Sequence, residues 1–337
     1  MTPSTTTPSM RALVLEAANT PFVSRQVARP VPGLGQVLVQ VLASGVNPLD
    51  SKIRTGSAAH AKHPLPAILG MDLAGVVRGV GAGVARWRFG DEVYGLTGGV
   101  AGLQGSLAEY VAVDADLLAR KPANLSMREA AALPLIAITA WEGLIDRARV
   151  QAGQKVLVHG GAGGVGHMAV QIAKAFGAEV FATASPAQAD VVRRFGATPI
   201  DYTTATIDDY VGEYTNGQGF DVVFDTVGGP VLDASFRAAR TYGGHVVSAL
   251  GWGTHSLAPL SFRAATYSGV FTLLPMLTGN GRAHHGEILE EITRLVEGGR
   301  LEPLMDVRRY TLDTALEAHE EVAAGRARGK IVVDVQG

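Results

Sequence analysis

A glycine-rich stretch between an apolar strand and an apolar helix carries the clearest chemical signal in the sequence. The run 155–159 is apolar and β-branched, apolar residues recur at helical spacing over 165–176, and Gly177 then supplies a helix stop. Between them the glycines follow the spacing G-x-G-x-x-G. Bare backbone N–H groups at a helix N-terminus bind a pyrophosphate, because the helix dipole is positive there. The stretch therefore predicts a dinucleotide site; the alternative is a tight strand–helix turn without a ligand. The predicted contacts are Gly161, Gly163, Gly164, Val165 and Gly166.

The end of the next expected strand, 179–184, indicates which dinucleotide binds. An NAD site usually has Asp or Glu there, about 20 residues past the glycines, to bind the ribose 2′-hydroxyl. This sequence has Ala184, Ser185 and Pro186. A carboxylate would meet a 2′-phosphate at roughly 4 Å and cost about 4 kcal/mol per charge pair at an effective dielectric near 20, so its absence favours NADP(H). The predicted phosphate contacts are Ser185 and Tyr202, with Lys174, Arg193 and Arg194 as further candidates or else as solvated surface cations.

The composition excludes several classes of protein. The chain has 337 residues, 47% hydrophobic and 18% charged, which allows two domains with sizeable cores. A net charge of −2 without a basic stripe argues against a nucleic-acid partner. The lack of cysteine excludes disulfides, thiol catalysis and thiolate zinc sites. Met1 to Ser9 is expected to be disordered and is no secretory signal, and no apolar stretch is long enough to span a membrane; we expect a soluble, cytoplasmic protein.

Two patterns divide the chain. Residues 10–125 contain short apolar runs separated by Gly, Pro and Asp turns, which is typical of a compact β unit with few helices. A capping box of Ser126 and Glu129 then opens a helix. From there strands alternate with helices, which predicts an α/β fold with a doubly wound parallel sheet. Its expected strands are 155–159, 179–184, 199–201, 221–224, 244–249 and 270–273.

The last part of the chain departs from this alternation of strands and helices. Helices are expected at 287–295 and 311–323, followed by a strand at 330–335. A lone terminal strand needs a sheet to join, so we expect this tail to return to the first domain.

Six motifs together resemble the medium-chain dehydrogenase/reductase superfamily, specifically its zinc-independent quinone oxidoreductase branch. The resemblance covers almost the whole chain. It implies a mainly-β GroES-like catalytic domain formed by residues 1–125 and 276–337, an inserted Rossmann domain formed by residues 126–275, and an active site between them. The motifs are SGVNPLD at 44–50, GMDLAG at 70–75, GDEVYG at 90–95, GSLAEY at 105–110, the segment 133–144, and the glycine stretch 160–166.

The resemblance also implies that a catalytic zinc is missing. Where zinc-dependent alcohol dehydrogenases carry a cysteine ligand this sequence has Asn47, and where they carry His-Glu it has Met71 and Asp72. A catalytic zinc needs three good protein ligands, and the loss of thiolate and imidazole leaves too few. His60 and His63, in a Pro- and Ala-rich loop, are the remaining candidates, and we predict no metal.

Reduction of an electron-poor acceptor remains feasible without zinc. The hydride of NADPH would go to the β-carbon of an enone or to a quinone ring, and the negative charge that develops on the acceptor oxygen needs a donor. In relatives with an Asn-Pro-x-Asp-x-Lys pattern these residues lie near the nicotinamide, so Asn47 and Lys52 are the candidates. Asp50 would orient the loop or pair with Lys52, and the alternative for Lys52 is an exposed surface lysine.

Other site residues carry over from the resemblance by position. Many quinone reductases have a tyrosine where this chain has Ser57 and Ala58, so water is the expected final proton donor. Asp225 is a turn residue at a strand end. The further cofactor contacts implied, each of which could also be ordinary core, are Thr139 beside the nicotinamide, Val227 and Leu250 after the fourth and fifth strands, and Phe271 and Leu273 near the nicotinamide amide.

Three functions are open at this stage. The first is a zinc-independent, NADPH-dependent quinone oxidoreductase. The second is a 2-alkenal or enoyl reductase acting on α,β-unsaturated carbonyl compounds. The third is an NADPH-binding structural protein with little turnover. The expected partners are a small electrophile and a second copy of the chain, because relatives pair through the edge of the Rossmann sheet.

Overall fold

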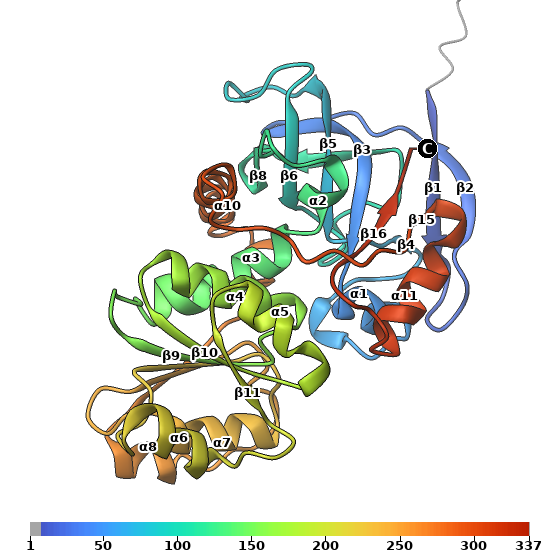
Figure 1. Ribbon diagram of the computed structural model, residues 1–337. Helices are drawn as coiled ribbons and strands as arrows, with labels where there is room; N and C mark the ends of the chain where they lie inside the picture. Colours follow the sequence, from blue (N-terminus) through green and yellow to red (C-terminus); the bar gives the residue numbers. More distant parts are fainter. Residues whose placement is uncertain (1–7, 337) are drawn as a thin grey trace, which may run out of the picture. The chain divides into compact units, whose positions relative to one another are not determined.

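The computed structural model of the protein describes residues 8–336, which form two compact units (Figure 1). Of these described residues, the first unit contains 8–135, 273–297 and 303–336, and the second contains 136–272 and 298–302. Most of the tail expected to be disordered, Met1 to Ser9, lies outside the described residues, although Ser9 already begins a strand. Within 8–336 every helix is too short or too polar to cross a membrane.

The first unit is mainly β, as the sequence predicted. A three-stranded sheet has the order β2-β1-β4, and a seven-stranded sheet has the order β15-β16-β3-β5-β6-β8, with β7 also paired to β3. The terminal strand β16 pairs antiparallel with β3, which confirms that the tail returns to this domain. The strands are β1 (Ser9–Leu15), β2 (Val23–Ala28), β3 (Gln36–Val46), β4 (Ala67–Ile68), β5 (Asp72–Val80), β6 (Glu92–Leu96), β7 (Tyr110–Asp114), β8 (Leu118–Arg120), β15 (Tyr310–Thr311) and β16 (Ile331–Asp334).

Short helices close the ends of these sheets. The predicted capping box is present: the Ser126 N–H donates to Glu129 Oε2 at 2.8 Å, and the Glu129 N–H donates to Ser126 Oγ at 3.3 Å. Helix α10 packs against β8, and α1 packs against α11 (Figure 1). The sequence analysis did not predict α1, although Pro48 and Asp50 are start signals for a helix. The helices are α1 (Pro48–Arg54), α2 (Met127–Ala131), α9 (Leu274–Thr278), α10 (Arg282–Glu297) and α11 (Ala315–Ala323).

The second unit is the predicted doubly wound sheet. Its six strands are parallel, in the order β11-β10-β9-β12-β13-β14. Helices α4 and α5 cover one face, and α6, α7 and α8 cover the other (Figure 1). The strands are β9 (Lys155–His159), β10 (Glu179–Ala184), β11 (Thr198–Asp201), β12 (Val222–Asp225), β13 (His245–Ser248) and β14 (Thr266–Gly269). The helices are α3 (Pro134–Trp141), α4 (Gly164–Ala175), α5 (Ala189–Arg194), α6 (Ile207–Thr215), α7 (Pro230–Ala238) and α8 (Ala258–Arg263).

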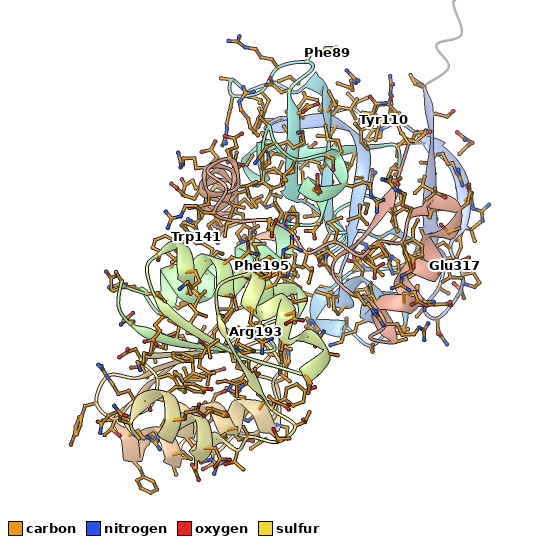
Figure 2. All side chains as sticks on the ribbon, viewed as in Figure 1. Phe89, Tyr110, Trp141, Arg193, Phe195 and Glu317 are labelled. Carbon is orange, nitrogen blue, oxygen red and sulfur yellow. The ribbon has the colours of Figure 1, made fainter. Side chains whose placement is uncertain are left out.

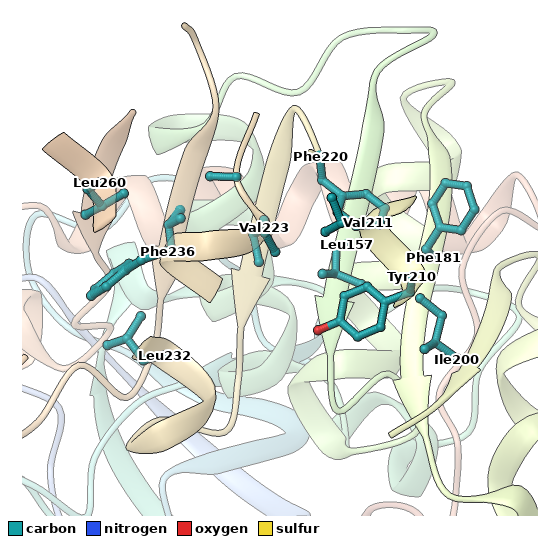
Figure 3. Close-up of a cluster of buried hydrophobic side chains, with 13 residues drawn as sticks. Leu157, Phe181, Ile200, Tyr210, Val211, Phe220, Val223, Leu232, Phe236 and Leu260 are labelled. Atoms are coloured by element: carbon teal, nitrogen blue, oxygen red, sulfur yellow. The ribbon is translucent and has the colours of Figure 1, made fainter. Parts of the chain in front are cut away.

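The core of this unit explains why its strands read as apolar runs. Strands buried on both faces must carry apolar side chains without alternation. Leu157 and Val223 from the central strands meet Phe220 and Phe236, and Phe181 packs edge-on against Phe220 with ring centroids 5.5 Å apart (Figure 3). The cluster holds the sheet rigid beneath the strand ends, where a ligand site would form.

One predicted strand was misplaced. The apolar run 270–273 was expected to be the sixth strand, but the strand is β14, four residues earlier. Residues of β14 are mostly exposed because it is the edge strand, so it lacks the apolar signal of a buried strand. Val270 and Leu273 are buried after the strand ends.

Candidate functional site

The predicted glycine turn lies between β9 and α4. Gly160 adopts φ 74°, and the Gly161 N–H donates to the Thr183 carbonyl oxygen at 2.9 Å. A Cβ on Gly161 would overlap the Ala182 side chain, and a Cβ on Gly166 would overlap the Gly160 carbonyl oxygen. These two glycines therefore allow the tight turn and the close packing of helix on strand, two of the three roles that a dinucleotide fingerprint assigns to glycine.

Gly163 is different, because its surroundings leave more room. It is the N-cap residue of α4, and the nearest atom to a Cβ built there is the Gly160 carbonyl oxygen at 3.1 Å. A Cβ at Gly163 would make one tight contact, with that carbonyl oxygen, which is much milder than the overlaps at Gly161 and Gly166, so the fold demands a glycine less strongly here. A dinucleotide fingerprint assigns its middle glycine to the close approach of the pyrophosphate. Helix α4 has 12 residues, and the N–H groups of its first residues, Gly164 and Val165, lie in its first turn, where they have no intrahelical acceptor and can donate to an anion.

The turn lies where the strand order reverses. Strand β9 has β10 on one side and β12 on the other, and the chain winds outward in both directions. Ligands of open parallel sheets bind outside the carboxyl ends of the strands at this point. The register places His159, Asp225 and Ser248 side by side at those ends.

A buried carboxylate fixes the loops that follow β12 and β13. Asp225 accepts hydrogen bonds from the Val227 N–H at 3.0 Å and the Gly228 N–H at 2.9 Å, as expected of a turn residue at a strand end. It also accepts from Ser248 Oγ at 2.7 Å, and Ser248 Oγ accepts from the Leu250 N–H at 3.0 Å. The predicted cofactor contacts Val227 and Leu250 are thereby positioned by one side chain.

A buried histidine completes this row. Burial lowers the pKa of His159 to about 4, although the nearby Asp225 carboxylate opposes the shift. The ring is therefore neutral at pH 7, and its Nδ1 lies 3.4 Å from Thr183 Oγ1. Neither His159 nor Ser248 was singled out in the sequence, because both read as parts of apolar strands.

The residues predicted to meet a 2′-phosphate come from two neighbouring strand ends. Ser185 follows β10 and is half-buried, and Tyr202 follows β11 and is 59% exposed. The structure also places Asp201 opposite Ala184, which the sequence analysis did not consider. Bonds from Thr203 and Thr204 lower the pKa of Asp201, so a carboxylate lies one strand away from Ser185.

The three cations considered for the phosphate have other surroundings. Lys174 is in the last turn of α4, at the opposite end from the glycine turn. Arg193, labelled in Figure 2, pairs with Asp190 at 2.7 Å. Arg194 pairs with Glu302 at 2.7 Å. Ser185 and Tyr202 remain the candidates.

Three predicted nicotinamide contacts have identifiable neighbours. Thr139 is buried on α3, and its Oγ1 shares a hydrogen bond of 2.9 Å with Thr272 Oγ1. Phe271, next to Thr272, packs edge-on against Trp252 with centroids 6.0 Å apart. Leu273 is buried at the start of α9.

The first unit holds a buried polar network around Asn47. The Asn47 N–H donates to Asp50 Oδ2 at 2.9 Å, and Asn47 Nδ2 donates to Asp72 Oδ2 at 2.8 Å. Lys330 Nζ donates to Asn47 Oδ1 and, at 3.1 Å, to the Val46 carbonyl oxygen, and lies 3.7 Å from Asp72 Oδ2. The network joins two predicted residues, Asn47 and Asp50, to two that the sequence analysis did not assign to the site.

Burial has the largest effect on the pKa values of the charged groups in this network. It raises the pKa of Asp50 to about 7, against the opposing bond from the Asn47 N–H. It also raises the pKa of Asp72 and lowers that of Lys330, and the attraction between these two groups opposes both shifts. Asp50 Oδ1 has no hydrogen-bond partner within residues 8–336. Two acids and one base are thus held out of water, at positions fixed by hydrogen bonds.

The predicted donor Lys52 lies elsewhere on the same element. It is the fifth residue of α1, and its side chain is exposed, whereas Asp50 is buried. The structure does not bring Lys52 into the network around Asn47; the buried ammonium there belongs to Lys330.

A cavity follows α1 at the position where many quinone reductases carry a tyrosine. Small residues here, Gly56, Ala58 and Ala59, line a cavity of about 380 Å³ together with His63. His63 Nδ1 accepts from the Gly102 N–H at 3.2 Å, and burial lowers the pKa of the ring, so the imidazole is neutral at pH 7.

The residues at the expected zinc position do not fit zinc. Asn47 and Asp72 are bonded to each other and to a lysine ammonium, which is a cation and has no lone pair to offer when charged. Among residues 8–336 no group of three or more His, Cys, Asp and Glu side chains is arranged to hold a metal ion.

Comparison with known protein families agrees with this architecture. A family model described as "Alcohol dehydrogenase GroES-like domain" matches residues 33–123, and one described as "Zinc-binding dehydrogenase" matches residues 195–333. A 2-methylene-furan-3-one reductase of Solanum lycopersicum is 38% identical over 308 residues, covering 88% of this chain and 71% of the relative. An NADPH-dependent alkenal/one oxidoreductase, chloroplastic, of Arabidopsis thaliana is 37% identical over 307 residues, covering 88% and 72%.

Solved structures of similar proteins indicate the same family. An alcohol dehydrogenase superfamily protein from Novosphingobium aromaticivorans is 59% identical with a TM-score of 0.95, covering 97% of this chain and 100% of the other. The quinone oxidoreductase from Coxiella burnetii is 30% identical with a TM-score of 0.82, covering 98% and 100%. The chain belongs to the medium-chain dehydrogenase/reductase superfamily, in its zinc-independent branch. It is thus a member of a family of oxidoreductases.

Proposed function

We propose that the protein is an NADPH-dependent reductase that transfers a hydride to electron-poor carbonyl compounds without the help of a metal ion. The observation that carries this proposal is the glycine turn at the reversal of the strand order, in which a Cβ on Gly163 would have one near neighbour, the Gly160 carbonyl oxygen at 3.1 Å. A bound NADPH supplies the hydride. The name of the plant alkenal/one oxidoreductase, which includes NADPH, agrees with this choice of cofactor.

Residues of this chain bind both the phosphate groups and the nicotinamide end of the cofactor. The first N–H groups of α4 donate to the pyrophosphate, and the loops that Asp225 positions bring Val227 and Leu250 against the nucleotide. Ser185 and Tyr202 donate to the 2′-phosphate. Thr139 and Phe271 contact the nicotinamide end.

Charge stabilisation on the acceptor oxygen comes from α1. Lys52 is exposed, so its ammonium is free to approach an oxygen that becomes negative as the hydride arrives. Asn47 Nδ2 uses one proton for Asp72 and has a second available. Asp50 accepts from the Asn47 N–H and so orients the start of α1. Water delivers the final proton.

A quinone is the first candidate acceptor, and an α,β-unsaturated carbonyl compound is the second. The Coxiella burnetii relative is named a quinone oxidoreductase. The two plant relatives, at higher identity, are named as reductases of a furanone and of alkenals and enones, which favours the second candidate.

Consumption of NADPH by the purified protein tests the proposal. Benzoquinones and short enones are supplied separately, and the nicotinamide absorbance is followed. We expect turnover with at least one class, and turnover with enones alone would remove the quinone assignment. Tight NADPH binding with no consumption of any electrophile would replace the proposal by a structural role.

Two copies of the chain are further proposed to pair through the edge strand β14. Among residues 8–336, strand β14 pairs with β13 alone. Phe262, four residues before it, is 86% exposed, and Tyr242, whose N–H donates to the Arg263 carbonyl oxygen, is 81% exposed. Light scattering on the eluting protein measures the mass, and a monomer at micromolar concentration would contradict this pairing.

A further inference from the structure

Three strand ends bring Lys330, Asn47 and Asp72 together from distant parts of the chain. Lys330 directly precedes β16, Asn47 directly follows β3, and Asp72 begins β5. Strand β3 lies between the other two, with Ile331 paired to Val46 and Asp72 paired to Gly45. The sheet itself therefore sets the distances between these three side chains.

The two charged neighbours permit only one orientation of the Asn47 amide. A lysine ammonium only donates hydrogen bonds, and a carboxylate only accepts them. Lys330 Nζ donates to Asn47 Oδ1, and Asn47 Nδ2 donates to Asp72 Oδ2 at 2.8 Å. A flipped amide would set N–H groups against the ammonium and an oxygen against the carboxylate. The side of Asn47 that is left for another group is consequently an N–H donor.

Each neighbour is itself held in place. Lys330 Nζ also donates to the Val46 carbonyl oxygen at 3.1 Å. Asp72 Oδ1 accepts from the Leu135 N–H at 2.9 Å, which leaves Oδ2 for Asn47. Lys330 and Asp72 are both buried, with 5% and 0% of their side chains exposed, so water does not compete for these bonds.

We propose that Lys330 is a positioning residue for hydride transfer: its ammonium fixes the Asn47 amide as a donor and supplies a positive charge behind it. This inference rests on the proposed function, in which Asn47 faces the acceptor oxygen. A preorganised donor backed by a buried cation stabilises a developing oxyanion without rearrangement during the reaction. In this arrangement Lys52 stabilises the oxyanion directly from the solvent-exposed side, and Lys330 stabilises it through Asn47 from the buried side.

Lys330→Gln tests this role, because glutamine keeps a donor for Asn47 and removes the charge. We expect kcat to fall roughly 10- to 100-fold, while KM for the acceptor and the NADPH affinity change by less than about threefold. Lys330→Arg keeps the charge and should recover most of kcat. A wild-type kcat in Lys330→Gln would overturn the proposal.

Lys121→Gln is a matched control. Lys121 is another buried lysine of the first unit, with Nζ bonded to the Pro122 and Leu125 carbonyl oxygens at 3.0 and 2.6 Å and 3.2 Å from Glu92 Oε2. Its loss should lower the melting temperature as the loss of Lys330 does and leave kcat unchanged. An equal loss of kcat in both variants would reduce Lys330 to a structural residue.

A readout without substrate separates this inference from the proposed function. In 15N-labelled protein the Asn47 side-chain amide, assigned by its loss in Asn47→Ser, should give one slowly exchanging pair of signals. The chemical shifts of this pair should change, and its protons should exchange faster with solvent, in Lys330→Met. If that variant does not fold, the double variant Lys330→Met with Asp72→Asn replaces it. Unchanged signals would refute the positioning role even in an active enzyme. Inactive wild-type protein with the expected signals would refute only the function.

Discussion

Gly166 lies so close to Gly160 that a Cβ at the first residue would overlap the carbonyl oxygen of the second. The contact joins the third glycine of the G-x-G-x-x-G motif, in the first turn of α4, to the residue that follows β9, and it brings the start of α4 close to the end of that strand. Gly163, by contrast, meets no protein atom closer than 3.1 Å from a built Cβ. Packing therefore explains Gly166, whereas our proposal assigns Gly163 to the approach of a ligand, and different substitutions can test the two roles separately.

Gly163→Ala should remove cofactor binding while the unit stays folded. Its backbone, with φ −76° and ψ 176°, suits alanine, and the methyl group would make one tight contact, 3.1 Å from the Gly160 carbonyl oxygen, so the melting temperature should fall only slightly. A methyl group there would stand between the α4 N-terminus and the pyrophosphate, and we expect the NADPH affinity to fall by roughly tenfold or more. Fluorescence titration with NADPH and a thermal melt measure the two effects.

Gly212→Ala is the control for that substitution. Gly212 is inside α6, and a Cβ there meets nothing within 4 Å. Alanine should leave NADPH binding unchanged and raise the free energy of unfolding by about 0.5–1 kcal/mol. Unaltered NADPH affinity in Gly163→Ala would show that the space beside Gly163 is not the phosphate site.

Local signals explain why part of the fold could be predicted. Strands 155–159 and 179–184 were placed at their observed bounds because buried parallel strands carry continuous apolar runs ended by turns. Strand β14 was displaced by four residues because an exposed edge strand, Thr266–Gly269, has no such run. The return of the tail followed from the need of a lone strand for a partner, and β3 is that partner.

The site was predictable only as far as its residues are neighbours in sequence. Asn47 and Asp50 are three residues apart, and a helix start brings them together. Lys330 is 283 residues away from Asn47, so no spacing rule connects them. The one sequence signal for Lys330 is a charged residue directly before the buried strand 331–334, where an unpaired charge would be costly. Asp201 was missed for a similar reason, since pairing of β10 with β11 brings it opposite Ala184.

Asp201→Asn should increase the preference for NADPH over NADH. Asp201 ends β11 and is paired with Ala184, the residue before Ser185, so its carboxylate would repel a doubly charged phosphate bound at these strand ends. Solvent screens this repulsion at an exposed site, so the NADPH affinity should rise by up to about fivefold while that for NADH changes little. Titration with both nucleotides measures the ratio.

The control for Asp201 is Asp208→Asn, which removes an exposed carboxylate in the first turn of α6. It should leave both affinities unchanged. A lower NADPH affinity in Asp201→Asn would mean that this side chain positions Tyr202 or its threonine neighbours for the cofactor instead of repelling the phosphate.

Lys52→Met should slow the reaction without weakening cofactor binding. The ammonium is exposed on α1 and would act on the acceptor oxygen as charge develops there. We expect kcat to fall roughly tenfold or more and the NADPH affinity to change by less than about twofold. Steady-state rates and an equilibrium titration give the two quantities.

Lys174→Met provides the comparison for Lys52. Lys174 is an exposed lysine in the last turn of α4, remote from the glycine turn at the other end of that helix. Its removal should leave kcat as it is. If Lys52→Met also kept the wild-type kcat, Lys52 would be an ordinary surface lysine.

Asp50 should make the stability of the first unit fall as the pH rises through the acid range. Burial raises its pKa from 3.8 to about 7, so between these values the folded state binds a proton that the unfolded state does not. The stabilisation is complete below pH 3.8 and is lost as the pH passes about 7. In Asp50→Asn this decline, on the order of a few kcal/mol, should be missing, and thermal melts at several pH values measure it.

Asp306→Asn should show the opposite dependence. Hydrogen bonds from Arg308 hold the pKa of Asp306 well below its usual range, so its contribution is present above pH 4 and is lost as the pH falls. The free energies of unfolding of wild type and Asp306→Asn should therefore differ most at neutral pH and converge in acid. Those of wild type and Asp50→Asn should diverge toward neutral pH, where the variant becomes relatively more stable.

The buried histidines His159 and His319 also make stability depend on pH. Their pKa values are lowered to about 4 and about 3, which adds a rise in stability with pH, so only the difference between wild type and variant isolates the contribution of Asp50. Parallel curves for wild type and Asp50→Asn would show that the buried carboxyl keeps an ordinary pKa, and that Lys330 neutralises both acids of the network.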